Sequence, residues 1–273
     1  MQGGSAQEPP SRPDAPHSIQ SMSEFFDPYT DPQTGILRNR IGATTQATLD
    51  CAEADLSVHR LVELADRYPV RPSGDLDELR SVHRHLFQDL YEWAGRSRTV
   101  DIRKPGGEPF LPASRIEVGT AYVFDELRRE NHLRGLSRPK FVERLAHHYD
   151  ALNYAHPFRE GNGRTQRVFW SRVARDAGWQ LDWRLVSREH NNEASRAAME
   201  RSDLRPLREM FDSITTAAMP GDRAAGRAAL DVARLAFAKP ATEATRPSQD
   251  TPRTGPQRPT PGAMSDRAPG IGE

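Results

Sequence analysis

Apolar residues recur at helical spacing in one segment after another between residues 45 and 214, and this periodicity limits the fold more than any other feature. In the first of these segments Leu49, Ala52 and Leu56 stand three or four positions apart. Residues so spaced form a stripe along one helix face, and the stripe is stable only when other elements cover it. The pattern therefore predicts a domain made mainly of packed helices.

The ends of the predicted helices follow from this spacing and from glycine and proline positions. Gly95 and Gly178 are expected to end helices, Pro139 is tolerated in a first turn, and Pro157 forces the preceding helix to end before it. An alanine-rich stretch at 223–238 could form one further helix. The other predicted helices span residues 45–65, with room for a break near Ser57, and residues 75–93, 116–127, 139–152, 162–174, 187–199 and 204–214.

One segment departs from helical spacing. Residues 98–103 alternate in the manner of a strand, residues 105–107 are a Pro-Gly-Gly turn, and residues 108–111 could return as a second strand. The sequence thus predicts a small β-hairpin within a helical protein. A lone hairpin is marginal in water and exposes free edges. It either serves a function or is an ordinary excursion between helices, and the pattern leaves both alternatives open.

Proline placement separates the domain from its ends. Twelve of the 22 prolines lie in residues 1–16 or 220–273, and both ends lack long apolar periodicity. Such segments cannot bury enough apolar surface to offset the entropy of an ordered chain. We predict one domain at residues 24–218, a flexible N-terminal tail at 1–23 and a Pro/Ala-rich, largely disordered C-terminal tail at 219–273.

Charge and cysteine content restrict the partners and the compartment. Lys and Arg together number 38, as do Asp and Glu, so no net field favours nucleic acid or an anionic membrane. Cys51 is the only cysteine and can form no internal disulfide, which fits a reducing compartment. The start of the chain lacks signal-peptide features, and no stretch approaches the roughly 20 apolar residues of a membrane span. We expect a cytoplasmic protein that binds neither nucleic acid nor membrane.

The residue types of a reactive site gather in residues 156–167, with the sequence HPFREGNGRTQR. Gly161-Asn162-Gly163 stands where a helix is predicted to begin, and the first N–H groups of a helix can bind an anion that glycines allow to come close. Arg164 and Arg167, three apart on one helix face, add guanidinium groups that suit phosphate oxygens. A phosphate site is thus predicted. The simpler alternatives are a plain turn and solvated arginines, and for Arg167 alone the latter is preferred.

Two titratable residues flank this predicted phosphate site. A carboxylate beside phosphates is repelled unless a cation lies between, so Glu160 is the candidate Mg²⁺ ligand, and its alternative is an exposed acid at a helix start. His156, at a helix exit, is the candidate base for a hydroxyl that attacks phosphate, whereas His147 and His148 lack such neighbours and are predicted to be structural. Together these groups indicate phosphoryl or nucleotidyl transfer from a nucleotide. No His-Glu-x-x-His zinc motif or Walker-type loop is present.

The stretch resembles the signature of Fic (filamentation induced by cAMP) domain proteins, His-x-Phe-x-(Asp/Glu)-Gly-Asn-Gly-Arg-x-x-Arg, at every specified position. Residues 34–39 and the helices ahead of the hairpin resemble bacterial toxin-type members, so the resemblance covers residues 24–215. It implies an all-α fold, a Fic-type helical bundle with a small β-hairpin flap. It also implies a protein adenylyltransferase that moves AMP from ATP to a hydroxyl side chain of a target protein.

The resemblance assigns roles by position. His156 resembles the general base and Glu160 the Mg²⁺ ligand, so ATP and Mg²⁺ are the expected co-substrate and cofactor. Gly161-Asn162-Gly163 resembles the anion hole for the α- and β-phosphates, and Arg164 and Arg167 would hold the terminal phosphates. The second glycine and the arginine after it match the adenylylating pattern and not that of Doc-type kinases. The hairpin falls where the flap should be, and a flap edge can pair with an extended target segment.

The resemblance also bears on regulation. Many members carry an inhibitory helix, (Ser/Thr)-x-x-x-Glu-(Gly/Asn), whose glutamate pairs with the last arginine of the signature. Glu130-Asn131 and Glu160-Gly161 are the only pairs of this kind, and the residues four positions earlier are Glu126 and His156, so neither fits. We therefore predict that a separate small antitoxin supplies a glutamate to Arg167.

Several alternatives stay open from the sequence. The chain is either the toxin of a toxin–antitoxin pair or an exported effector, and a Fic-like kinase and a catalytically idle protein-binding module are the other functional alternatives. The expected target carries a Ser, Thr or Tyr hydroxyl, and the toxin-type resemblance suggests topoisomerase subunits. Contacts to adenine are expected near the helices after Gly178.

Overall fold

The helices of this chain lie close to the predicted ranges. The computed structural model describes residues 27–67, 69–218 and 243–245. Nearly all of both predicted tails, and the alanine-rich stretch at 223–238, lie outside the described residues. The helices are α1 (Gln46–Arg67), α2 (Leu76–Phe87), α3 (Ile116–Arg129), α4 (Arg138–Ala155), α5 (Asn162–Asp176), α6 (Arg188–Arg201) and α7 (Arg205–Ile214), with short 3-10 turns at Ala113–Arg115, Asn131–Leu133 and Trp183–Leu185.

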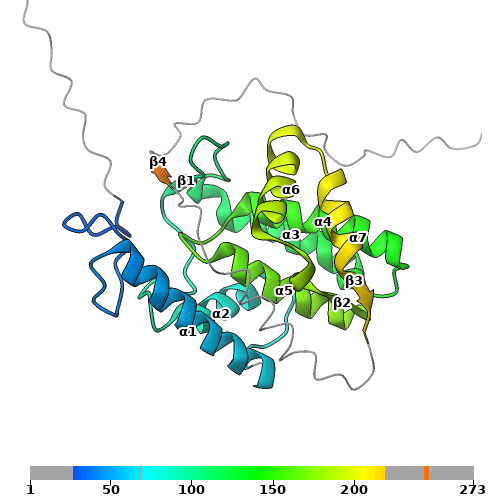
Figure 1. The fold of residues 1–273 in the computed structure, drawn as a ribbon. Coiled ribbons are helices and arrows are strands. Elements are labelled where there is room, and N and C mark those ends of the chain that lie inside the picture. Colours follow the sequence, from blue (N-terminus) through cyan, green and yellow to red (C-terminus); the bar gives the residue numbers. More distant parts are fainter. Residues whose placement is uncertain (1–26, 68, 219–242, 246–273) are drawn as a thin grey trace, which may run out of the picture.

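Helix α5 runs through the middle of the bundle (Figure 1). On one side α2 packs against it, and α1 packs on α2. On the other side α4 contacts α5 as well as α3, α6 and α7. The described helices include none with both the length and the apolar character needed to cross a membrane. The segment that joins α4 to α5 is the predicted site stretch, so the site is held between the two central helices.

Helix α5 is buried on nearly all sides although it is rich in polar residues. Phe169, Trp170 and Val173 belong to the hydrophobic core, yet Arg172 is buried as well. A buried charge is costly unless a counter-ion and hydrogen bonds accompany it. Glu78 of α2 meets this need, because its two carboxylate oxygens accept from Nε and Nη2 of Arg172 at 2.8 and 2.6 Å. This ion pair joins α2 to α5.

One helix end differs from the prediction, and the break that the prediction allowed within the first helix is absent. Helix α1 is continuous through Ser57, whose hydroxyl donates to a carbonyl of the preceding turn at 3.2 Å. Helix α2 ends at Phe87 and does not reach Trp93, because the amides of Leu90 and Tyr91 both turn back to the Phe87 carbonyl at 3.0 and 2.9 Å. The turn lets the rings of Tyr91 and Trp93 stack in the core at 4.4 Å. Aromatic packing here overrides the helical spacing of the sequence.

The predicted hairpin at 98–111, called the flap below, is present, but its return segment at 108–111 forms a single bridge in place of the predicted second strand. Strand β1 spans Asp101–Arg103. Pro109 forms an antiparallel bridge with Arg103, and the Phe110 amide donates to the Ile102 carbonyl of β1 at 3.1 Å. Proline has no N–H, so the ladder cannot extend through residue 109. Backbone pairing in the flap is therefore confined to the base of the turn.

Two strand pairs were not predicted. Strand β4 (Glu243–Thr245) pairs antiparallel with β1, and Figure 1 shows the two side by side. Strands β2 (Trp179–Leu181) and β3 (Thr215–Ala217) form the other antiparallel pair, which connects the ends of α5 and α7. Each strand has three residues, which is too short for alternation to be visible in a sequence.

The Arg172–Glu78 pair leads to a stability prediction. Glu78→Ala removes both carboxylate contacts that α2 makes to the buried Arg172 guanidinium, which keeps the partly exposed Asp176 at 2.9 Å, and should lower the free energy of unfolding by about 3 kcal/mol. The matched control is Asp77→Ala, because the neighbouring Asp77 carboxylate is exposed and lies 3.6 Å from Arg80; its cost should stay under about 1 kcal/mol. Urea unfolding of both variants measures the difference. Equal costs would contradict the assigned role of the pair.

Candidate active site

His156 ends α4 in a left-handed backbone conformation, with φ 41° and ψ 60°. A non-glycine residue in this region stores strain that surrounding contacts must hold. Its Nδ1 lies 3.2 Å from the carbonyl of Asn153, and since a carbonyl can only accept, Nδ1 carries the proton and donates. Nε2 is therefore the nitrogen with a free lone pair, as a general base requires.

The imidazole of His156 is buried beneath the flap. Phe110 stacks on it, with ring centroids 3.7 Å apart and an interplanar angle of 12°. Burial lowers the pKa of His156 well below 6.5, and the positive charges of Lys104 and Arg98 lower it further. The ring is consequently neutral at neutral pH and able to accept a proton.

Asn162, the first residue of α5, fixes the loop that follows His156. Its Oδ1 accepts from the Phe158 amide at 2.9 Å, and its Nδ2 donates to the Phe158 carbonyl at 2.7 Å. Arg159 in the same loop donates to Asp27 at 2.9 Å. The polar side-chain atoms of Asn162 thus hold the loop, which leaves its backbone N–H at the start of α5 as the group that could meet an anion.

The two glycines beside Asn162 serve different purposes. Gly161 has φ +82°, and a Cβ there would lie 2.4 Å from the Phe87 ring, so both conformation and space require glycine. Gly163 stands within the first turn of α5, where a Cβ would lie 3.4 Å from Nη1 of Arg167. The guanidinium of Arg167 therefore lies next to the start of the helix, where a phosphate is predicted.

Arg167 is buried, with 6% of its surface exposed, and is not the surface residue that its sequence context alone favours. Its Nε has no hydrogen-bond partner, and no carboxylate of the described chain forms an ion pair with it. Burial lowers its pKa to about 10, and the nearby charge of Arg164 acts in the same direction. The group still carries its charge at neutral pH, so a buried cation lies at the predicted phosphate site without an anion.

Arg164 has the opposite environment. Its Nη2 forms a buried ion pair with Glu53 of α1, its Nη1 donates to Ser57 at 3.2 Å, and its guanidinium lies 4.6 Å from the centroid of the Phe87 ring. The Tyr91 hydroxyl also donates to Glu53. The structure therefore uses Arg164 to join α5 to α1. Glu53 gave no signal in the sequence, because its partner lies more than a hundred residues away.

Glu160 lies immediately before this helix start and is partly exposed. Its Oε1 accepts from the Gly161 amide at 2.9 Å and lies 3.8 Å from Nη2 of Arg164. Its Oε2 takes part in no hydrogen bond with the described residues. A carboxylate with one unengaged oxygen beside an anion site has the chemistry expected of a Mg²⁺ ligand.

His83 of α2 supports the loop from below and was not predicted. The Gly95 amide donates to Nδ1 at 2.8 Å, so Nε2 carries the proton and donates to the Glu160 carbonyl at 2.9 Å. Its ring stacks on Phe158 at 3.9 Å. Burial lowers the pKa of His83 to about 3, so it stays neutral. In the sequence, only its place on the apolar face of a predicted helix indicated that His83 would be buried.

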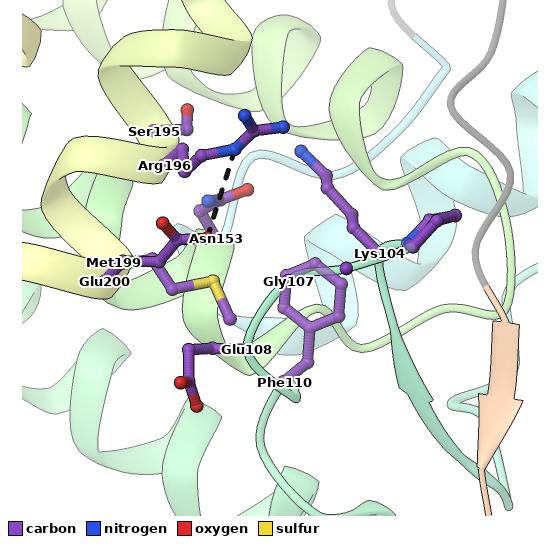
Figure 2. A pocket seen from close by; sticks show the side chains of 11 residues that line it. Lys104, Gly107, Glu108, Phe110, Asn153, Ser195, Arg196, Met199 and Glu200 are labelled. Carbon is purple, nitrogen blue, oxygen red and sulfur yellow. Dashed lines mark ion pairs between the residues drawn. The ribbon is translucent and has the colours of Figure 1, made fainter.

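A pocket lies between the flap and α6 (Figure 2). Its volume is about 190 Å³, and Ser195 on its wall has a buried hydroxyl without a hydrogen-bond partner. The pocket adjoins Phe110, which covers His156, and so continues the site toward a helix after Gly178. Its walls are formed by Lys104, Pro105, Gly106, Gly107, Glu108 and Phe110 of the flap, Asn153 of α4, and Ser195, Arg196, Met199 and Glu200 of α6.

His147 and His148 lie apart from this site, in hydrogen-bond contacts of α4 with carboxylates at the end of α3. His147 lies 3.1 Å from Glu126, and His148, which is fully buried, lies 3.0 Å from Glu130. Arg144 bonds to both of these carboxylates. These contacts agree with the structural role predicted for the two histidines.

Gly161 allows a matched test of the helix start. Gly161→Ala should lower the free energy of unfolding by more than Gly178→Ala, because both positions have positive φ but only the first meets a side chain, the Phe87 ring. We expect about 1 kcal/mol for the conformational cost at either site and about 1–3 kcal/mol more at Gly161 for the clash. Urea unfolding measures both. A Gly161→Ala cost no larger than that of Gly178→Ala would contradict the packing described.

The comparisons with known proteins agree with this geometry. The Fic/DOC family matches residues 73–174. The chain is 43% identical over 169 residues to protein adenylyltransferase VbhT of Bartonella schoenbuchensis, a match that covers 62% of this chain but only 35% of that protein. It is 38% identical over 201 residues to the probable protein adenylyltransferase Fic of Escherichia coli K12, covering 72% of this chain and 98% of that protein.

Solved structures show the same fold. The BepC protein of Bartonella tribocorum with bound AMPPNP superposes with a TM-score of 0.67 at 28% identity, covering 70% of this chain and 97% of that one. The N-terminal Fic domain of a Bep effector from Bartonella quintana with bound ADP gives 0.66 at 31% identity, covering 69% and 94%. The predicted all-α bundle with a small flap is confirmed. Because the match to the E. coli protein spans nearly its whole length, this chain belongs to the Fic/DOC family.

Proposed function

We propose that this chain is a protein adenylyltransferase, which moves AMP from ATP to a hydroxyl side chain of a target protein. The observation that carries the proposal is Arg167, a buried cation beside Gly163 with no acidic partner among the described residues. Such a group is unfavourable until an anion joins it, and the terminal phosphate of ATP would be that anion. The names of VbhT and the E. coli Fic protein, and the AMPPNP bound to BepC, support this proposal.

The proposed reaction uses the two sides of the helix start. The α- and β-phosphates lie against the backbone N–H groups of Gly161-Asn162-Gly163, and the terminal phosphate lies against Arg167. Nε2 of His156 takes the proton of the target hydroxyl while that oxygen forms a bond to the α-phosphorus. The bond from the α-phosphorus to its bridging oxygen breaks, and pyrophosphate leaves. Transfer of AMP, and not of phosphate, follows from attack at this atom.

Glu160 would hold Mg²⁺ together with phosphate oxygens, since its Oε2 is unengaged within the described structure. The bound ion would neutralise phosphate charge. Arg164 remains a proposed phosphate ligand, but only through N–H groups that Glu53 and Ser57 do not occupy. Its charge is largely balanced by Glu53, so in this proposal Arg167 has the stronger interaction with phosphate.

The pocket beside α6 is the proposed site of the adenine base. It adjoins His156 through Phe110 and Asn153, and it combines apolar atoms of Met199 with polar groups such as the unpartnered Ser195 hydroxyl. A base needs this mixture of flat apolar contact and a few hydrogen bonds. Its wall on α6 fits the expectation that adenine contacts lie near the helices after Gly178.

The flap is the proposed docking edge for the target. In this structure β1 pairs antiparallel with β4, so the backbone groups on that edge are able to accept a strand. An extended target segment that takes the same place would be brought beside His156, with little dependence on its sequence. Topoisomerase subunits are the target class that the toxin-type resemblance suggests.

The control of activity is proposed to come from a second protein. An antitoxin glutamate that pairs with Arg167 would fill the position of the terminal phosphate and block ATP. The unpaired state of Arg167 within the described chain supports an inhibitor from outside it. A cytoplasmic toxin is the form we propose, and the similarity to VirB-translocated Bartonella effectors keeps export as the alternative.

Labelled ATP tests the proposal directly. The purified chain, without any partner, should transfer label from α-labelled ATP to a protein in a cell lysate that contains Mg²⁺. His156→Ala should reduce this transfer by about 100-fold or more, because it removes the proton acceptor.

Transfer activity should persist below pH 6.5, since the lowered pKa of His156 keeps the base neutral there. Autoradiography of the separated proteins measures the label.

The other outcomes each select a different function. Transfer of γ-label alone would indicate a Fic-like kinase, and no label from either nucleotide would indicate a protein-binding module. A chain that is inactive alone and gains activity only when a terminus is trimmed would contradict control by a separate antitoxin. Arg96→Ala, at an exposed position outside the site, serves as the matched control and should retain full transfer.

A further inference from the structure

Arg98 lies at the base of the flap and is itself buried, with 2% of its surface exposed. Its Nε donates to the His156 carbonyl at 2.9 Å, and its Nη1 donates to the Val100 carbonyl at 2.7 Å. Its Nη2 donates to the carbonyls of Leu111 and, at 3.4 Å, Ala155. One side chain therefore joins the end of α4 to both arms of the flap.

Backbone hydrogen bonds complete this junction. The Arg98 amide donates to the Pro157 carbonyl at 2.8 Å, and the Leu111 amide donates to the Tyr154 carbonyl at 3.0 Å. When the backbone and side-chain hydrogen bonds are taken together, residues 98 and 111 donate to the carbonyls of four successive residues, 154–157. The last carbonyls of a helix lack internal partners and form the negative end of its dipole, so a buried cation is favourable there.

We propose that Arg98 is a positioning residue for the transfer reaction. It holds the His156 backbone in its left-handed conformation and fixes the flap against it, so that Phe110 covers the imidazole and Nε2 keeps one orientation. The inference rests on the proposed function, because that function makes His156 the base. It adds a residue outside residues 156–167 on which the base depends.

The shape of the guanidinium is essential to this role. Its planar fork offers five donors, and Arg98 makes four hydrogen bonds from its three nitrogens to four different carbonyls. A lysine ammonium has the same charge, but its three donors diverge from a single atom. Arg98→Lys therefore retains the positive charge while losing the link between α4 and the flap.

The charge has a separate and measurable effect on His156. The cations that face the ring are Lys104 of the flap and Arg98, and the Asn153 carbonyl accepts from its Nδ1. After burial, these two charges lower the pKa of His156. Loss of the Arg98 charge should therefore raise this pKa and move the acidic limb of the pH profile to higher pH. Arg98→Met should show that movement, and Arg98→Lys should not.

The test compares Arg98→Lys and Arg98→Met with Arg96→Lys and Arg96→Met. Arg96 is two residues away and exposed. We expect kcat for transfer of α-label to fall about 100-fold in both Arg98 variants, the effect of a reacting group displaced by about 1 Å. The affinity for ATP with Mg²⁺ should stay within about threefold of the original, because the proposed phosphate site lies on α5. The Arg96 variants should match the unmodified chain in both measurements.

Three results would overturn the positioning role. They are folded Arg98 variants with kcat within about threefold of the original, a loss of ATP affinity as large as the loss of kcat, and failure of both Arg98 variants to fold. Thermal unfolding of each variant decides the last point. If the unmodified chain itself transfers no label, the proposed function fails, and NMR titration of the His156 ring then tests Arg98 alone. An unchanged His156 pKa in Arg98→Met would show that the Arg98 guanidinium does not lie beside the ring, which would contradict the contact on which the positioning role depends.

Discussion

The burial of positive charge in α5 is the constraint on which the rest of the structure depends. Three guanidinium groups of this one helix lie inside the protein, and each has to be balanced. Glu53 of α1 balances Arg164, and Glu78 of α2 balances Arg172, so these pairs bring the first two helices against the centre of the bundle. Arg167 is the exception within the described chain. We propose that its partner is a phosphate of the substrate or a glutamate of an inhibitor.

A second constraint acts on the opposite side of the site, where α4 ends. The free carbonyls at that end are taken up by the base of the flap, mainly through Arg98. The same contact holds His156 in an unfavourable backbone conformation and in a dry environment that keeps its imidazole neutral. The loop between α4 and α5 thus differs in charge at its two ends. The hydrogen-bonded carbonyls of α4 lie next to His156, and positively charged groups lie at the start of α5. In the proposed reaction, this difference in charge would orient the nucleotide.

The sequence predicted what depends on local spacing. Helix ranges, the flap and the stretch from His156 to Arg167 were found because periodicity, turn residues and a short motif are visible in neighbouring positions. Glu53 and Arg98 were not found, because their partners lie far away along the chain and their types are common on surfaces. For the same reason the free state of Arg167 could not be foreseen. Its burial depends on helices that fold over it, and its isolation depends on the absence of a nearby carboxylate.

The most direct measurement compares the binding of ATP and of AMP, each with Mg²⁺, to the unmodified chain and to Arg167→Gln by calorimetry. If Arg167 binds the terminal phosphate of ATP, the chain should bind ATP more tightly than AMP, which lacks that phosphate. The variant should then lose about 10- to 100-fold in ATP affinity, the worth of a hydrogen bond to a charged group, while its AMP affinity stays the same. An ATP affinity that is unchanged in Arg167→Gln would contradict the account.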